Sequence, residues 1–203
     1  MKVLIACEES QEVCKAFRDK GHEAYSCDLQ ESSGSLPEFH IIGDARDVIK
    51  SYDWELLIAH PPCTYLSRAG ARWLYPQKGI ICPDRYKKLE EAKEFFLFFY
   101  NCDVPKICIE NPTPFKVAEL PQYSQVIQPY QFGHAFSKRT LLWLKGLPKL
   151  QPTKTVENYK PFLPSNTGGK TRGQSYSRGV AKDSKESSKT FTGIAEAMAD
   201  QWG

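Results

Sequence analysis

The sequence predicts an α/β fold with a mostly parallel sheet and flanking helices, and two observations lead to this prediction. Short apolar runs alternate along the chain with segments of helical periodicity, the order expected of strand–helix–strand crossovers. At least five of the apolar runs stop at polar residues, as strands do where they leave a buried sheet. The 203 residues are enough for one domain with a sizeable core.

The predicted elements follow one another in the order of such a fold. The expected strands are residues 2–6, 23–27, 40–42, 54–59, 106–109 and 139–144, and the expected helices are residues 11–20, 83–101 and 192–202. Gly21 follows the first helix, a position that favours glycine. Pro83 begins the second, where a missing N–H costs little. The first strand, helix and strand fit within 30 residues, a length that suits a parallel crossover.

The net charge of +3 excludes a uniformly basic protein that wraps nucleic acid. The charge is uneven, because residues 151–189 hold eight basic and three acidic residues. This stretch has no periodicity and is rich in Pro, Gly, Ser, Thr and Lys, which predicts a loop or a segment that orders on binding. We therefore expect a core over 1–150, a basic loop-rich segment over 151–189 and a C-terminal helix over 190–203 that returns to the core.

No apolar run reaches the roughly 18 residues of a membrane span, so the sequence predicts no contact with a membrane. The first apolar run is too short for a signal peptide, which predicts the cytosol. The seven cysteines include no CxxC pair, and they indicate reduced thiols rather than a disulfide framework or a metal site. The oligomeric state is not fixed by any of these features.

Polar residues follow the predicted strands, and in an open parallel sheet such positions gather at one edge, where ligands bind. They are Glu8, Glu9 and Ser10; Asp28; Asp44; residues 60–63; and Glu110 with Asn111. Pro61 and Pro62 stiffen their turn and would hold Cys63 at this edge. The start of a loop or helix beside Cys63 would lower the pKa of its thiol. A thiol and the Glu110 carboxyl in one cleft suit covalent addition to an electron-poor ring.

Each of these residues also has a structural interpretation. Cys63 alone would be a buried thiol, and Glu110 alone a cap. Asp28 and Asp44 are each typical turn formers, and His60 has no assigned role. The position of Cys63 in a Pro-Pro-Cys turn, together with Glu-Asn-Pro after another strand, favours the chemical interpretation.

The order of these motifs resembles the DNA (cytosine-5) methyltransferases, and in particular a small, phage-type relative. The Pro-Cys dipeptide that this family carries after its fourth strand, with a following Ser and Ala-Gly, corresponds to residues 62–70. Its Glu-Asn dipeptide corresponds to Glu110 and Asn111, and its acid and Gly-Asp turn correspond to Asp28 and residues 43–44. Residues 131–143 and 190–197 match the later motifs. The resemblance covers most of the chain outside residues 151–189.

The resemblance implies a Rossmann-like class I methyltransferase fold and methylation of cytosine C5 in DNA with S-adenosylmethionine. Cys63 would add to C6 of a flipped-out cytosine, and flipping costs a few kcal/mol that pocket contacts recover. Glu110, next to Asn111, would hold ring N3 and the exocyclic amine. Arg139 would be the basic residue near the attacked ring, and C5 would then take the methyl group.

The resemblance also implies the binding residues. Those expected at the cofactor are Glu8, Glu9, Ser10, Asp28 at the ribose hydroxyls, Asp44 at the adenine, and Pro61. Those expected at DNA are Ser67, Arg68, Lys170, Arg172 and Arg178, since basic residues among Gly and Ser suit phosphate contact. If the chain is encoded by a phage, the expected location is the host cytosol.

The sequence departs from the family in two places. The family's glycine-rich first motif lets the backbone approach the cofactor, but residues 6–11 contain no glycine, so the cofactor would bind differently, more weakly or not at all. The family's large target-recognition domain is replaced by residues 151–189. A DNA-recognition segment this small favours recognition of a short or loosely defined DNA sequence.

Two other functions remain open on the sequence. An amino-group DNA methyltransferase uses a polar-Pro-Pro-aromatic turn, which residues 60–63 match in part, with Tyr65 close to the missing aromatic. A non-catalytic DNA-binding or decoy protein would keep the methyltransferase fold without the cofactor, and the glycine-free first loop favours it.

Overall fold

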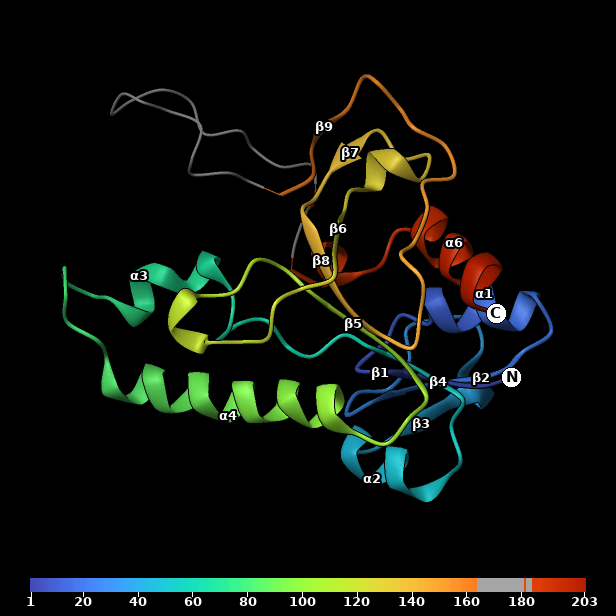
Figure 1. Cartoon of the computed structure of the whole chain (residues 1–203), viewed down its shortest axis with the longest axis horizontal. Helices are drawn as coiled ribbons and strands as arrows, with labels where there is room; N and C mark the ends of the chain where they lie inside the picture. Colours follow the sequence, from blue (N-terminus) through green and yellow to red (C-terminus); the bar gives the residue numbers. More distant parts are fainter. Residues whose placement is uncertain (164–180, 182–183) are drawn as a thin grey trace.

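The centre of the molecule is a seven-stranded sheet of order β3-β2-β1-β4-β5-β8-β6 (Figure 1). The computed structural model describes residues 1–163, 181 and 184–203. Strands β1 to β5 are all parallel to one another, and β8 runs antiparallel to β5 on one side and to β6 on the other. This order confirms the predicted Rossmann-like α/β class, in which the chain winds outward from a central strand in both directions.

The strands of this sheet are β1 Lys2–Ala6, β2 Glu23–Asp28, β3 His40–Ile42, β4 Leu56–Ala59, β5 Lys106–Asn111, β6 Gln125–Ile127 and β8 Thr140–Lys145. Two further strands, β7 Phe136–Ser137 and β9 Lys160–Pro161, form a small separate ladder. Glu110 and Asn111, which the sequence places after a strand, are the last two residues of β5. They belong to it because they pair with Leu142 and Leu141 of β8.

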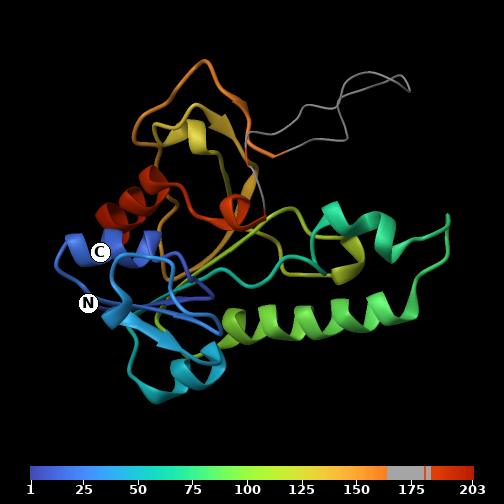
Figure 2. The ribbon, with the colours of Figure 1, turned by 180° about the vertical axis from the view of Figure 1, so that it is seen from behind.

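Helices cover both faces of the sheet (Figures 1 and 2). They are α1 Glu12–Asp19, α2 Ala45–Ser51, α3 Ala71–Leu74, α4 Pro83–Asn101, α5 Ser184–Ser188 and α6 Thr192–Trp202, with single 3-10 turns η1 Pro37–Phe39, η2 Arg68–Gly70, η3 Lys116–Ala118 and η4 Pro129–Gln131. Helices α1 and α6 pack on one face, and α2 and α4 on the other. Among the described helices, none combines the length and apolar character needed to cross a membrane.

Successive residues of the central strands point to opposite faces, and both faces are apolar. On β1, Leu4 faces the α4 layer while Val3 and Ile5 face the α1 and α6 layer. All three are fully buried. A strand that is buried on both faces has a continuous apolar run in its sequence. The central strands could be predicted for this reason. The core therefore surrounds the sheet and leaves its polar chemistry to the strand ends.

Residues 151–163, the first part of the predicted basic segment, are mostly exposed but are attached to the rest of the molecule at a few points. The backbone N–H of Val156 donates to Tyr130 O at 2.8 Å, and Phe162 is buried against Phe136 and Phe191. Residues 164–180, 182 and 183 lie outside the described residues. Helix α6 then packs beside α1, with an ion pair of 2.5 Å between Lys20 and Asp200.

Gly146 follows β8 with a φ of +65°, and its Cα faces the carbonyl group of Pro105. We expect Gly146→Ala to lower the free energy of unfolding by about 2 kcal/mol or more, because the new methyl group strains the backbone and overlaps Pro105. Gly21 also has a positive φ, +83°, but open space around it. Gly21→Ala should cost only about 1 kcal/mol. Urea unfolding measures both, and equal losses would contradict a packing effect at Pro105.

Candidate active site

The carboxyl ends of four strands lie level along one edge of the sheet. One row of paired residues crosses these strands and consists of Cys27, Ala6, Ala59 and Ile109. The residues that follow them in the chain are Asp28, Cys7, His60 and Glu110. The strand order reverses between β1 and β4, and open α/β sheets bind ligands at such a switch point. The polar strand ends therefore gather at the position where a ligand is expected.

Asn111 fastens the Cys63 turn to β5. Its side-chain amide donates to the carbonyl of Pro61 at 3.0 Å, and the residue is 1% exposed. The turn is closed by the N–H groups of Leu66 and Ser67, which donate to Cys63 O at 3.1 and 2.8 Å. Pro61 and Asn111 are thus placed to position Cys63, which is half-buried at this edge.

The Cys63 thiol is protonated in the free protein. Burial raises the pKa of Cys63, and the nearby Glu110 carboxylate raises it further, while Lys138 and a hydrogen bond from Ser67 oppose both effects without outweighing them. The expectation that the turn would lower this pKa is therefore wrong for the free protein. The physical reason is that burial destabilises the thiolate by more free energy than the local N–H groups and Lys138 stabilise it.

Glu110 is the ionised partner of this thiol. Burial acts to raise the pKa of Glu110, but a hydrogen bond from His60 and the charges of Lys138 and His60 outweigh burial and lower it. The Nδ1 atom of His60 lies 3.1 Å from Glu110 Oε2, and the two side chains are 12% and 15% exposed. At neutral pH the edge of β4 and β5 therefore presents a thiol beside a carboxylate.

Lys138, rather than Arg139, supplies the positive charge at this edge. Lys138 lies just before β8 and lines a small cavity together with Glu110, and its charge acts on both Cys63 and Glu110. The Arg139 side chain is exposed. Sequence reasoning missed Lys138 because a basic motif does not show which of two adjacent side chains points inward. The remaining residues that line this cavity are Ile127, Thr140, Thr190, Phe191, Ile194 and Met198.

Glu8 caps helix α1. Its two carboxylate oxygens accept from the N–H groups of Val13 at 2.7 Å and Cys14 at 3.2 Å. Burial raises the pKa of Glu8 even so. Cys7 and Gln11 have φ of 59° and 58°, the left-handed region that favours glycine. The loop thus makes a tight turn without glycine, and these two N–H groups are no longer free for an anion such as a pyrophosphate.

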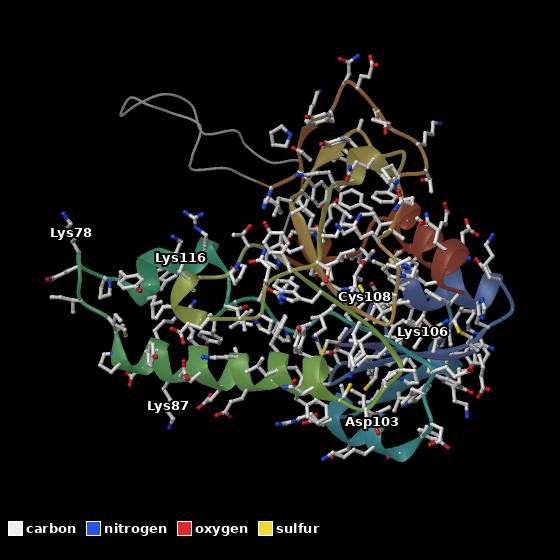
Figure 3. The ribbon with its side chains drawn as sticks, viewed as in Figure 1. Lys78, Lys87, Asp103, Lys106, Cys108 and Lys116 are labelled. Carbon is white, nitrogen blue, oxygen red and sulfur yellow. The ribbon has the colours of Figure 1, made fainter. Side chains whose placement is uncertain are left out.

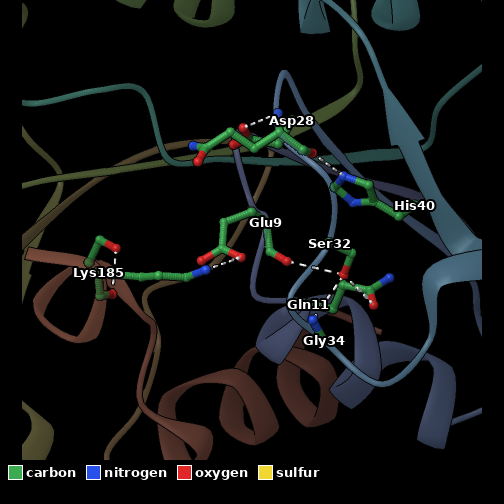
Figure 4. A network of polar contacts seen from close by, with 9 residues as sticks. Glu9, Gln11, Asp28, Ser32, Gly34, His40 and Lys185 are labelled. Carbon is green, nitrogen blue, oxygen red and sulfur yellow. Dashed lines mark hydrogen bonds and ion pairs between the residues drawn. The ribbon is translucent and has the colours of Figure 1, made fainter.

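Gln11 joins the loop after β2 to the loop after β1 (Figure 4). Its amide donates to Leu36 O at 2.7 Å, and its Oε1 accepts from Ser32 at 2.9 Å. Gly34 packs so closely on Gln11 and on the carbonyl of Ser10 that a Cβ there would overlap them. The two linked loops follow the carboxyl ends of β1 and β2. Neither Gln11 nor Gly34 belongs to a motif that the sequence analysis identified.

The other acidic residues of this edge differ in how far they are engaged. Asp44 caps α2 and pairs with Arg46 at 2.5 Å, which holds the pKa of Asp44 below its usual range. Asp28 accepts from the N–H of Gln30 at 3.0 Å. Glu9 has a buried Oε2 with no hydrogen-bond partner among the described residues, and the Lys185 ammonium lies 3.6 Å away (Figure 4). Asp28, which forms no ion pair among the described residues, and Glu9, whose ion pair with Lys185 is long, are therefore the acids of this edge that are least engaged.

An edge of this composition suits a positively charged cofactor. The carboxylates of Glu8, Glu9, Asp28 and Asp44 all stand at the ends of β1 to β3. S-adenosylmethionine carries an ammonium and a sulfonium group, which such carboxylates stabilise. A cofactor with phosphate groups would be repelled by these carboxylates. It could not be bound by the first N–H groups of α1 either, because these already donate to Glu8. The residues present therefore fit S-adenosylmethionine better than a nucleotide cofactor.

The predicted DNA-contacting residues fall in three places. Ser67 is buried beside Cys63, and Arg68 is exposed next to it. Lys170, Arg172 and Arg178 lie outside the described residues. Residues 64–88, which we call the arm, hold six basic residues and one acid. The arm contains α3 and the start of α4 and projects beyond the sheet (Figure 1), and Figure 3 shows Lys78, Lys87 and Lys116 around it.

Comparison with known proteins gives matches among solved structures only. No protein-family model and no curated protein matches the chain. It is similar to a structure described as a DNA modification methyltransferase encoded within an Escherichia coli prophage, with 11% identity and a TM-score of 0.46 over 76% of this chain and 51% of the other. It is also similar to a variant of Spodoptera frugiperda DNMT2, with 14% identity and a TM-score of 0.39 over 82% and 56%.

A third similar structure is the Entamoeba histolytica methyltransferase EhMeth, with 14% identity and a TM-score of 0.45 over 76% of this chain and 57% of the other. The chain spans little more than half the length of these three proteins. At such identities the similarity concerns the fold, and the fold class here is defined by the strand order and register.

We expect Lys138→Gln to slow alkylation of Cys63 by iodoacetamide several-fold at pH 8, because loss of the ammonium raises the pKa of the thiol further. Glu110→Gln should accelerate it, since the repelling carboxylate is gone. Mass spectrometry of the Cys63 peptide measures both rates. Arg139→Gln is the matched control and should leave the rate unchanged. A slower rate in Arg139→Gln than in Lys138→Gln would contradict the placement of Lys138 at the thiol.

Proposed function

We propose that this protein is a DNA cytosine-C5 methyltransferase that uses Cys63 as nucleophile and S-adenosylmethionine as methyl donor. The observation that supports it is the grouping of the Cys63 thiol, the Glu110 carboxylate and the Lys138 ammonium at one strand edge. A nucleophile, an acid–base group and a cation in one place suit addition to a ring that must take up a proton. The acid-rich ends of β1 to β3 beside them suit the donor.

In the first step the Cys63 sulfur forms a bond to C6 of a flipped-out cytosine. The electrons of the C5–C6 double bond shift through C4 to N3, and Glu110 takes the proton lost by the thiol and passes it to N3. Glu110 holds N3–H and the exocyclic amine. As negative charge on Glu110 is shared with the ring, its repulsion of the thiolate falls, and Lys138 stabilises the sulfur as it ionises.

C5 of the resulting enamine is the carbon that is methylated. S-adenosylmethionine supplies the methyl group when it is bound, and Glu9 and Asp28 are the residues we propose to hold it. Glu8 and Asp44 shape the same edge while they cap α1 and α2. Loss of the C5 hydrogen as a proton then allows the C6–S bond to break, and this returns Cys63.

The arm is the surface that we propose for the DNA backbone. It begins at the residue after Cys63, so a strand held on it passes the thiol. No ion pair among the described residues engages Arg68, Lys78 or Lys87. Such side chains are available to neutralise phosphates, the sequence-independent part of DNA affinity.

Tyr65 argues against amino-group methylation, the alternative enzyme activity. An amino-methyltransferase needs an aromatic ring near its Pro-Pro turn that is free to stack on the base. The ring of Tyr65 is already covered by the guanidinium of Arg85 at 4.2 Å and by the ammonium of Lys88 at 5.4 Å. Arg85 also donates to Thr64 O at 2.9 Å, which anchors the start of the arm to α4.

We expect the protein to form a covalent adduct with DNA that contains 5-fluorocytosine, in the presence of S-adenosylmethionine. Fluorine cannot leave C5 as a proton, so the bond from Cys63 to C6 would persist. Cys63→Ser should abolish the adduct, while Cys102→Ser, a half-buried cysteine away from this edge, should form it at the wild-type rate. Denaturing electrophoresis of labelled DNA measures the yield.

The same experiment separates the alternatives. Methyl transfer that survives Cys63→Ser would indicate amino-group methylation and overturn the proposed chemistry. Absence of both adduct and methyl transfer, together with no heat on calorimetric titration with S-adenosylmethionine, would indicate a binding or decoy protein.

The arm yields a second prediction, on DNA affinity. We expect Lys78→Gln combined with Lys87→Gln, two exposed lysines of the arm, to weaken DNA binding and to reduce the slope of log affinity against log salt by about 2, near 0.9 for each duplex phosphate contact. Lys50→Gln combined with Lys149→Gln changes the charge equally, on exposed residues outside the arm. Fluorescence anisotropy over a salt series measures both, and equal effects of the two pairs would contradict a specific role of the arm.

A further inference from the structure

His60 is a largely buried histidine to which the proposed chemistry assigns no role. It directly follows β4, and its backbone N–H donates to Ala6 O at 2.9 Å, which fixes its position between β1 and β5. Its Nδ1 lies 3.1 Å from Glu110 Oε2, and the side chain is 12% exposed. An ionised carboxylate can only accept, so Nδ1 carries the hydrogen.

The two ring nitrogens of His60 differ in their surroundings. Nε2 is buried and has no hydrogen-bond partner among the described residues. The ring interacts electrostatically with the carboxyl groups of both Glu8 and Glu110. A ring held only for stability would be expected to satisfy both nitrogens, because an unpaired buried polar atom is costly.

We propose that His60 is a positioning residue that fixes one oxygen of Glu110 and presents the other oxygen to the cytosine ring. This inference rests on the proposed function. The Nδ1–H hydrogen bond leaves Oε1 of Glu110 as the oxygen that can meet N3 and the exocyclic amine. Misplacement of such a group by an ångström is enough to reduce a rate about 100-fold.

The charged groups around His60 define what its loss would do. Glu8 faces it from the loop after β1, Glu110 from β5, and Lys138 acts on Glu110 from the start of β8. Without His60, Glu110 keeps Lys138 but loses its hydrogen-bond donor, and burial then favours its protonated form. A neutral Glu110 no longer repels the Cys63 thiolate, so Cys63 reports the charge on Glu110.

A series at position 60 tests the proposal through the 5-fluorocytosine adduct. We expect His60→Ala and His60→Gln to slow adduct formation about 10- to 100-fold. His60→Asn places its amide nitrogen near the position of Nδ1 and should remain close to the wild-type rate. In a Glu110→Gln background, His60→Ala should add little further loss, because the two residues act as a unit. His22→Asn, at the opposite end of β2, is the control and should match the wild type.

Alkylation of Cys63 in the free protein gives a readout independent of activity. At pH 6, Glu110→Gln should accelerate alkylation in the wild-type background. In the His60→Ala background this acceleration should shrink, since Glu110 then carries less negative charge. A purely structural role for His60 would leave the acceleration unchanged, provided that circular dichroism shows a folded chain.

The outcomes separate the two levels of inference. If the wild-type protein forms no adduct, the proposed function fails, while the alkylation experiment still tests the coupling of His60 to Glu110. If the wild type forms the adduct and folded His60→Ala forms it equally fast, the positioning role is wrong. If His60→Ala does not fold, His60→Asn and His60→Gln decide the matter, because equal rates for these two would overturn the role of the Nδ1 donor.

Discussion

The level register of β2, β1, β4 and β5 is the constraint on which the candidate site depends. A sheet that is apolar on both faces has only its ends for polar side chains, and these strands end in one row. Charged groups so close to the core must be paired or bound by N–H donors. Glu8 meets this requirement with the first N–H groups of α1, and Glu110 meets it with His60.

The same crowding explains the resting state of the thiol. Cys63 follows a turn that Asn111 links to β5 through the carbonyl of Pro61, which keeps the thiol near Glu110. Burial keeps the nucleophile protonated while no base is bound, and the carboxylate that is placed to hold the base adds to this effect. A ring that shares the charge of Glu110 relieves this repulsion. Nucleophile activation and base binding are therefore linked through one electrostatic interaction, in a position where low dielectric strengthens it.

The charge of the chain is organised around this edge. The ends of β1 to β3 are acidic, and the arm that begins beside Cys63 is as basic as residues 151–189. The small net charge is therefore the sum of an acidic region, which suits a cationic cofactor, and a basic region, which suits a polyanion. The two regions meet at His60 and Cys63, which follow β4, beside the position where the strand order reverses between β1 and β4.

Strand polarity and apolar patterning by themselves determined the α/β class, the bounds of α4, and the presence of Cys63 and Glu110 near one another. These are local or periodic properties, which a chain carries in its residue order. The tertiary structure decided the rest. That Lys138 points inward while Arg139 is exposed, that Glu8 caps α1, and that His60 lies between two carboxylates all depend on strand register and side-chain direction. Helix α2 and strands β6, β7 and β9 were not predicted from the sequence. Segments so short carry little periodicity, and packing against the core stabilises them.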